Sequence, residues 1–204
     1  MAIKFQYNKT SLQQLVKQFK VRVRTLPIIK SKESALRVEV KRCKEELATL
    51  EAELENSISQ YDSMFALWNE FNTSLVSIKD VKMDVKKIAG TRIPILEDVV
   101  FDIKEFSLFD SPGWYYDGIS ILQSLAKAAI LCEFTEAKLN LLEKARKKTT
   151  QKVNLFEKVQ IPGYEDAIRK IKRFMEDEEN LSKSSQKILK SLLEKRAEQE
   201  DKEA

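Results

Sequence analysis

Apolar side chains recur along the first part of the chain in alternating steps of three and four residues, from Leu12 to Val85. We call this series the seam. Its few polar members are Arg22, Glu33, Ser57 and Lys82. A 3.5-residue repeat held for about ten heptads is typical of a long helix that buries one narrow stripe against another helix. The seam therefore predicts an N-terminal helix over residues 10–88, which at 1.5 Å per residue would be roughly 110 Å long.

A less regular apolar stripe follows in the last third of the chain and predicts a C-terminal helix over residues 118–195, with Asp117 as its N-cap. Proline lacks a backbone N–H, so we expect Pro27 to bend the first helix and Pro162 to bend or break the second. The predicted fold class is all-α in the main, a long antiparallel two-helix coiled coil. We expect one elongated unit of residues 1–204, with residues 196–204 as a frayed polar tail.

The segment between the helices, residues 89–117, has a different composition, because prolines and glycines interrupt several short apolar runs. These runs predict a short β-hairpin at the tip of the helix pair, with Lys104 and Glu105 as its turn. Exposed apolar clusters usually mark contacts, so the tip is a candidate partner-binding site. The same side chains could instead pack onto the helices. The candidate residues are Val99, Phe101, Ile103, Phe106, Leu108 and Trp114.

Composition excludes most catalytic chemistry. The chain has no histidine, which removes the commonest general base and metal ligand. The four glycines are scattered and form no phosphate-binding loop. We therefore expect no catalytic, cofactor-binding or metal-binding residues. The net charge of +4 is small, and the basic run at residues 144–152 lacks interleaved aromatics, so we expect no nucleic-acid partner.

Neither membrane insertion nor disulfide chemistry is indicated. No apolar run approaches the roughly 18 residues of a membrane span, and the N-terminus lacks a signal-peptide core. We therefore expect a cytosolic protein without direct membrane insertion. If the chain turned back near residue 102, Cys43 would face residue 161 and Cys132 would face residue 72, which is too far apart for a disulfide.

Three stretches of sequence carry a family resemblance. They are Ile28-Ile29-Lys30-Ser31-Lys32 with Leu36, then Gly90-Thr91-Arg92-Ile93-Pro94, and then Lys152-Val153-Asn154-Leu155-Phe156-Glu157-Lys158-Val159-Gln160-Ile161-Pro162. In order and spacing they resemble the Leu-Leu-Lys-x-Lys, Gly-x-x-Ile-Pro and Val-Asn-x-x-Glu-x-Val-x-Ile-Pro stretches of the D subunit of V-type (archaeal-type) ATP synthases. The resemblance covers essentially the whole chain. One departure is that the acidic stretch 174–179 lacks the arginine usual in the family.

This resemblance implies a central-stalk rotor subunit that transmits torque between a membrane ion-translocating ring and a catalytic hexamer. It implies three partners: the hexamer of catalytic and regulatory subunits, a small F-type rotor subunit at the middle segment, and the subunit that caps the membrane ring. It also implies a place peripheral to the cytoplasmic face of the membrane. The shaft ends inside the hexamer would carry Ile3, Phe5, Tyr7, Leu181, Ile188 and Leu192.

A cytosolic coiled-coil adaptor or chaperone-like interaction protein, with no role in ATP synthesis, accounts for the heptads equally well. Co-purification with a nucleotide-hydrolysing hexamer distinguishes a rotor from such an adaptor.

Overall fold

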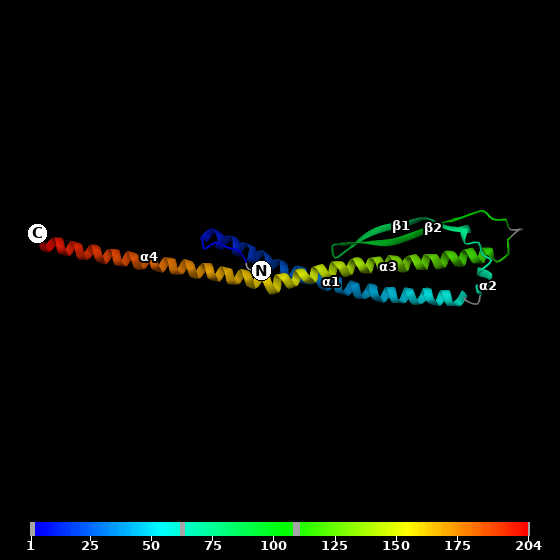
Figure 1. Ribbon diagram of the computed structural model, residues 1–204, viewed down its shortest axis with the longest axis horizontal. Coiled ribbons are helices and arrows are strands. Elements are labelled where there is room, and N and C mark those ends of the chain that lie inside the picture. Colours follow the sequence, from blue (N-terminus) through cyan, green and yellow to red (C-terminus); the bar gives the residue numbers. More distant parts are fainter. Residues whose placement is uncertain (1–2, 62–63, 108–110, 204) are drawn as a thin grey trace. The chain divides into compact units, whose positions relative to one another are not determined.

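The computed structural model describes residues 3–61, 64–107 and 111–203, apart from the side chains of 65–66 and 197–203. Two strands, β1 (Val76–Ile88) and β2 (Thr91–Ile103), form an antiparallel hairpin. The other elements are helical: α1 (Lys9–Tyr61), α2 (Phe65–Trp68), the 3₁₀ turn η2 (Thr73–Leu75), α3 (Tyr115–Leu155), the π-helix η3 (Phe156–Gln160) and α4 (Ile161–Glu203). The expected fold class, mainly helical with a short β-hairpin, is confirmed (Figure 1).

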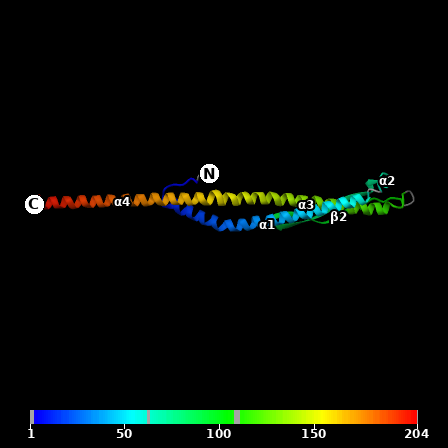
Figure 2. The same cartoon turned by 90° about the horizontal axis from the view of Figure 1, so that it is seen from below.

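Contacts within the chain group its residues into two units. The first unit consists of Met1–Lys30 and Gln151–Ala204, and the second of Ser31–Thr150. In the first unit the beginning of α1 lies antiparallel to η3 and the beginning of α4. In the second unit the rest of α1 lies antiparallel to α3, and the hairpin runs beside them (Figures 1 and 2).

The expected helix over residues 10–88 is wrong beyond Tyr61, where α1 ends. Residues 76–88 form β1, which is rich in the β-branched residues that favour strands. Two register shifts in the hairpin, between Ile78 and Asp80 and between Lys82 and Met83, interrupt the alternation of apolar and polar residues. The first shift adds one residue to β1, so Ile78 and Val85 share a face although they lie seven residues apart, as they also would in a helix.

The hairpin turns at Ala89 and Gly90, not at Lys104 and Glu105 as expected. Ala89 has a φ of 47° and Gly90 a φ of 79°. A two-residue turn between twisted strands favours positive φ at both positions, which glycine adopts most readily. Lys104 instead lies at the base of the hairpin, where its backbone N–H donates to the Leu75 carbonyl at 2.9 Å.

The core of the second unit forms where α1, α3 and β2 meet. Leu36, Val40 and Cys43 of the seam pack against Leu142 of α3 and Ile93 of β2. Leu36 and Leu142 are fully buried. The turn of the hairpin closes this core, because Ile88 and Ala89 pack onto it. The hairpin is thus a third layer over the two helices of this unit.

The pairing of α1 with α3 differs from the expected register. The Cys43 thiol lies 3.6 Å from the Thr135 carbonyl, whereas the sequence places this cysteine opposite residue 161. Lys44 pairs with Glu143 at 2.7 Å, and Lys138 pairs with Glu46 at 2.9 Å. The expected register assumed helix as far as the tip, whereas 13 residues of that stretch form β1 and fold back along the helices.

The first unit has a separate core. Leu15 of the seam packs against Tyr164, Ala167 and Ile171 of α4. The arm before α1 and further seam residues cover these side chains; they are Ile3, Phe5, Leu12 and Phe19, joined by Ile168 and Met175 of α4. Seam positions therefore bury apolar side chains in both units.

Pro162 does not break the C-terminal helix. The chain passes from α3 through η3 into α4, and the Ile161 N–H bonds to the Phe156 carbonyl five residues earlier. A proline ring crowds the preceding helical turn and supplies no N–H, and a wider π turn relieves both problems. At the other end, α3 begins at Tyr115, so Asp117 lies in its first turn and is not the N-cap.

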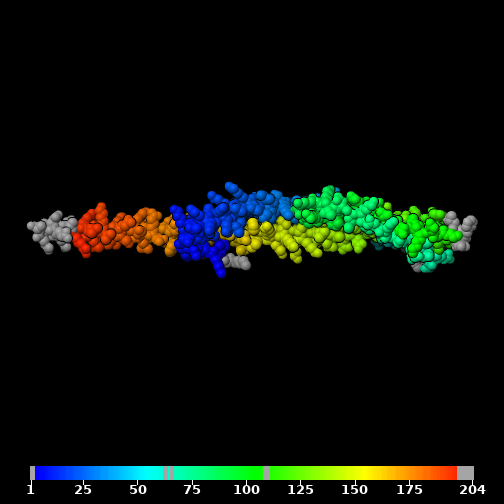
Figure 3. Space-filling model, turned by 90° about the horizontal axis from the view of Figure 1, so that it is seen from above, coloured from blue at the N-terminus to red at the C-terminus, as the bar shows by residue number. Residues whose placement is uncertain are grey.

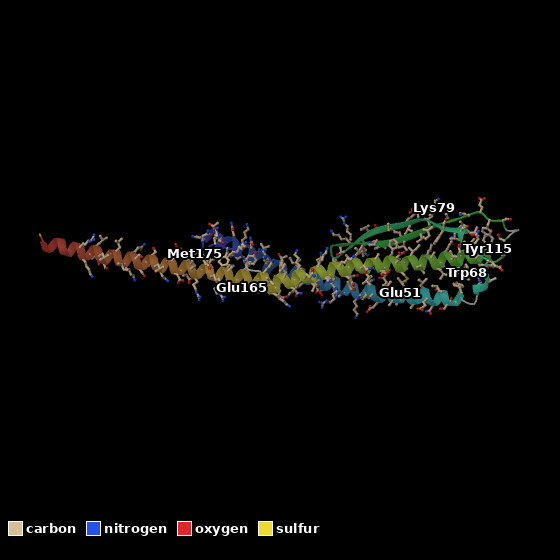
Figure 4. All side chains as sticks on the ribbon, viewed as in Figure 1. Glu51, Trp68, Lys79, Tyr115, Glu165 and Met175 are labelled. Atoms are coloured by element: carbon tan, nitrogen blue, oxygen red, sulfur yellow. The ribbon has the colours of Figure 1, made fainter. Side chains whose placement is uncertain are left out.

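Aromatic rings close the end of the second unit at the start of α3. Trp114 contacts Trp68 and Phe71, each with 5.6 Å between ring centroids, and Phe71 contacts Tyr115. Trp68 and Tyr115 are seen at this end in Figure 4. Gly118 lies beneath the cluster, where an added Cβ would meet Cζ3 of Trp114 at 2.8 Å. Only glycine leaves room here for the indole.

Replacing Leu142 with alanine is expected to lower the free energy of unfolding by about 2–5 kcal/mol, because it opens a cavity in a fully buried site. Urea unfolding followed by far-UV circular dichroism measures the loss. Leu141→Ala is the matched control, because this neighbour is 40% exposed, and it should change the stability by about 0.5 kcal/mol or less. Equal losses in both variants would contradict the assigned core.

Gly118→Ala is expected to cost about 1–3 kcal/mol, because the new methyl group overpacks the aromatic cluster. Both tryptophans of the chain, Trp68 and Trp114, belong to this cluster, so their fluorescence should shift to longer wavelength. Gly113→Ala is the control, since an added Cβ there meets no atom within 4 Å. Emission spectra and unfolding curves that coincide for the two variants would rule out this packing.

Candidate partner-binding surfaces

Neither metal binding nor thiol chemistry is apparent in the described part of the chain. No group of three or more histidine, cysteine, aspartate or glutamate side chains there could hold a metal ion. Cys43 is buried and Cys132 is half-buried, and burial raises the pKa of both thiols. A raised pKa leaves less of the reactive thiolate near neutral pH. The features that bear on function are the exposed apolar surfaces.

The residues expected at the tip occupy different environments. Val99 is only 4% exposed, and Phe101 is half-buried with the Lys127 ammonium 5.9 Å from its ring centroid. Phe106 is half-buried against Tyr115, and Trp114 belongs to the aromatic cluster. Four of the expected residues thus pack within the second unit.

The other two expected tip residues differ from these. Ile103, the last residue of β2, is 47% exposed. Leu108 lies outside the described residues.

The hairpin presents an apolar surface that the sequence analysis missed. Met83 is 62% exposed and Val85 is 60% exposed. Their cross-strand partners are Leu96 and Pro94, and partners in a register share one face of a sheet. We call Met83, Val85, Pro94 and Leu96 the hairpin patch. Figure 3 shows the hairpin on the surface of the second unit.

Positive charge borders the hairpin patch. The next pair on the same face is Lys87 and Arg92, and both side chains are exposed. The patch was missed because residues 83 and 85 were assigned to a helix, where they would not share a face. Met83 and Val85 alternate with charged residues along β1, and this period of two is the strand pattern that marks the patch.

The N-terminal arm is bound to the first unit. Ile3 and Phe5 pack onto the core around Leu15. Tyr7 is 51% exposed, yet its ring lies 4.9 Å from the ring of Phe174 on α4. Of the expected shaft-end residues, these three therefore lie against the paired part of the first unit.

The C-terminal part of α4 carries a stripe of uncovered apolar side chains. Leu181 is 70% exposed, Ile188 is 61% exposed and Leu192 is 52% exposed. Leu189 and Leu193 are also more than half exposed. We call these five residues the α4 stripe. In the described part of the first unit, no other element covers this end of α4, which is drawn in orange and red in Figure 3.

The α4 stripe is not supported by tertiary packing. The ion pairs along this stretch link neighbouring turns of the same helix, as Lys183 does with Glu179 at 2.7 Å. Such exposed pairs contribute only about 0.3–0.5 kcal/mol each. Isolated helices are marginal in water, and a stripe of large apolar side chains prefers a partner surface. This end of α4 is therefore suited to binding another protein.

Charged groups also link the two helices of the second unit. The Lys44 ammonium bonds to Glu143 and holds the pKa of that carboxyl below its usual value. Glu33, a polar member of the seam, accepts hydrogen bonds from Arg37 and Thr150, and the bond from Arg37 is the main cause of its lowered pKa. Glu143 and Glu33 thus take part in polar contacts between α1 and α3.

One helical segment, Tyr115–Arg196, contains an 18-residue window with a mean hydropathy of 1.2, which is apolar enough by length and composition to cross a membrane. Only 17% of the window is buried. Helices that pack inside proteins pass the same test. Part of this segment does pack in that way, since Ile119 and Leu142 are buried in the second unit.

Comparison with known proteins identifies the chain's relatives. A family model for the D subunit of ATP synthase matches residues 11–191. The D subunit of the V-type ATP synthase of Borreliella burgdorferi is 29% identical over 193 residues, which are 93% of this chain and 95% of that protein. The corresponding D subunit of Chlamydia muridarum is 31% identical over 157 residues, 74% of this chain and 77% of the relative.

A further relative, the V-type ATP synthase D subunit of Chlamydia pneumoniae, is 26% identical and covers 96% of both chains. The region matched by the family model includes the seam, the hairpin, η3 and the first three residues of the α4 stripe. The chain therefore belongs to the family of ATP synthase D subunits.

Proposed function

We propose that this protein is the central-stalk rotor subunit of a V-type ATP synthase or ATPase. In this role it transmits torque between the ion-translocating ring and the catalytic hexamer, during ATP synthesis or ATP-driven transport of protons or sodium ions. It contributes no catalytic residues and lies at the cytoplasmic face of the membrane as part of the complex. The observation that carries the proposal is the α4 stripe, left uncovered in a chain of the D-subunit family.

The α4 stripe is proposed to lie inside the hexamer of catalytic and regulatory subunits. Burial of a leucine or isoleucine side chain contributes about 1.5–3 kcal/mol, so five such residues provide a strong yet non-directional contact. A contact without directional bonds suits a shaft that must present different faces to successive catalytic sites. The arm residues Ile3, Phe5 and Tyr7 are proposed to support α4 where it enters the hexamer, because they already pack against it.

The hairpin patch is proposed to bind the small F-type rotor subunit. Its apolar side chains protrude from a two-stranded sheet, and Lys87 and Arg92 beside them favour an acidic rim on the partner. Exposed Ile103 lies at the other end of β2, beyond the inward-packed Val99 and Phe101. In this proposal Val99 and Phe101 act indirectly, because they hold the hairpin against the second unit.

The aromatic end of the second unit is proposed to meet the subunit that caps the membrane ring. Tyr116 is 58% exposed there, beside the ring of Phe106. Aromatic side chains are enriched in protein interfaces, where they supply a large contact area at low entropic cost.

Deletion of residues 181–204 is expected to uncouple ion transport from ATP hydrolysis in the assembled complex. A complex reconstituted with the shortened chain should pump several-fold fewer ions per ATP hydrolysed, because the hexamer loses its grip on α4, while nucleotide binding by the hexamer should not change. Ion uptake and ATP hydrolysis measured together in proteoliposomes give this ratio. The control is Lys187→Ala in the full chain, which removes an exposed charge beside the stripe and should keep the ratio.

A shortened chain that couples as well as the full chain would exclude a bearing role for the α4 stripe. Failure of the full chain to co-purify with a nucleotide-hydrolysing hexamer would instead favour a coiled-coil adaptor. The purified chain alone should hydrolyse no ATP.

The double change Met83→Ser with Val85→Thr is expected to weaken binding of the small rotor subunit. A loss of about 1.4 kcal/mol corresponds to a tenfold rise in Kd, which isothermal calorimetry resolves. The thermal unfolding of the chain itself should hardly move, because both side chains are more than half exposed. Lys79→Ser, at an exposed site on the same strand, is the control for charge and strand propensity. An unchanged Kd in the double variant would place the partner elsewhere.

A further inference from the structure

A charged residue interrupts the seam in the first unit. Arg22 occupies a seam position between Phe19 and Leu26, where the repeat calls for an apolar side chain. Its guanidinium crosses to the opposite helical segment, where Nε donates to Oε1 of Gln160 at 2.8 Å. One of its terminal nitrogens, Nη1, donates to the Gln18 carbonyl at 3.2 Å on its own helix.

Aromatic rings complete the surroundings of Arg22. The guanidinium carbon lies 4.5 Å from the ring centroid of Tyr164 and 6.0 Å from that of Phe156. The Tyr164 hydroxyl donates to Oε1 of Gln18 at 2.7 Å, and this tyrosine is only 7% exposed. Hydrogen bonds and a cation–π contact thus link four residues across the two helical segments. We call Gln18, Arg22, Gln160 and Tyr164 the arginine layer.

The arginine layer lies at a disturbance of the helical repeat. The inward positions of the opposite helical segment are 153, 156, 160, 164, 167 and 171, where side chains are buried or half-buried. The steps from 156 to 160 and from 160 to 164 are both of four residues, so the alternation of three and four changes phase at the π-helix. A π turn contains about one more residue than an α turn, so Phe156–Gln160 holds one residue more than regular α-helix would in the same turn.

The π turn at residues 156–160 could close into regular α-helix or form further along the chain. Closing it would rotate the following part of α4 by about 100° about its axis, and moving it past residue 171 would rotate the residues in between by the same angle. Ala167 and Ile171 would then turn away from α1. The loss of their burial opposes this rotation.

The arginine layer adds directional polar contacts to this apolar packing. Gln160 ends the π-helix and Tyr164 lies one turn beyond it, so both lose their partners if the π turn moves. The Arg22 guanidinium would then be left between the helices without its acceptor and aromatic faces. Arg22 is half-buried, so loss of the Gln160 acceptor and of the aromatic faces disfavours that arrangement. The observed position of the π turn is favoured because it avoids this loss.

We propose that the arginine layer holds the π turn at residues 156–160 and thereby fixes the rotational phase in which α4 faces α1. A polar side chain in an otherwise apolar coiled-coil seam can set the register of its helices in the same way. This role of the arginine layer is confined to the first unit and does not depend on rotation of the chain inside a hexamer.

The test is the distance between spin labels attached to cysteines at positions 14 and 172, both exposed in the first unit, in a chain carrying Cys43→Ala and Cys132→Ala. The parent chain should give one narrow distribution by double electron–electron resonance. Arg22→Leu should add a second population, because a 100° rotation moves a side chain about 5–6 Å from the helix axis by about 8 Å. Arg24→Leu, at an exposed site on the same helix, is the matched control and should keep one population.

A combined variant tests whether the effect of Arg22→Leu depends on the π turn. Deleting exposed Lys158 removes the extra residue, so Arg22→Leu combined with this deletion should return to one population. The melting temperature distinguishes this role from simple stabilisation. Arg22→Leu replaces a half-buried charge, so it should keep or raise the melting temperature while two rotational positions of α4 become populated.

Three outcomes would overturn the proposal: one unchanged population in Arg22→Leu, a second population that survives the deletion, or the same second population in Arg24→Leu. If Arg22→Leu does not fold by circular dichroism, Gln160→Leu and Tyr164→Phe replace it. Each removes one hydrogen bond of the layer, and a single distance in both would equally overturn the proposal.

Discussion

Leu36, Val40 and Cys43 lie on one narrow stripe of α1, and their burial against Leu142 and Ile93 is the contact on which the second unit depends. A stripe this narrow imposes a strict condition on whatever covers it. The opposite helix must bring an apolar side chain to the stripe at every turn, or the contact is lost. The condition recurs in the first unit, where Leu15 meets Tyr164, Ala167 and Ile171.

Several features follow from that condition. In the second unit the hairpin adds a third layer where the stripe is best buried, and cross-helix pairs such as Lys44 with Glu143 hold the same register. In the first unit one extra residue would turn the apolar face of α4 away, and the π-helix takes it up. The surfaces left over, the hairpin patch and the α4 stripe, contribute little to these cores. Their apolar side chains are the ones we propose for binding the rest of a rotary complex.

Sequence reasoning succeeded where the apolar repeat had a single interpretation. Between Leu12 and Tyr61 the steps of three and four fit only a helix, and α1 occupies that range. Beyond it, the seam positions Ile78 and Val85 lie seven residues apart in β1, a spacing that a helical repeat also gives, so β1 was missed. The turn was misplaced because Ala89-Gly90 lacks the Asn-Gly pattern that marks two-residue turns.

The candidate site was predictable only in part. The exposed apolar side chains of Leu181, Ile188 and Leu192 could be named from the sequence, because their spacing follows one face of a helix. Which apolar side chains of the middle segment face inward could not be derived, since that depends on the hairpin register. Val99 and Phe101 therefore pack inward while Met83 and Val85, absent from the prediction, lie outside. The π turn, where the second stripe changes phase, likewise could not be derived from the sequence.

Direct observation of rotation tests the central claim, that this chain is a rotor. The chain would carry a biotin on a cysteine at exposed position 79 of the hairpin and be assembled with a surface-fixed catalytic hexamer. A bead bound to that biotin reports movement when ATP is added. We expect the bead to turn in one direction and to stop when ATP is removed. A complex that contains the chain and hydrolyses ATP while the bead stays still would contradict the assignment.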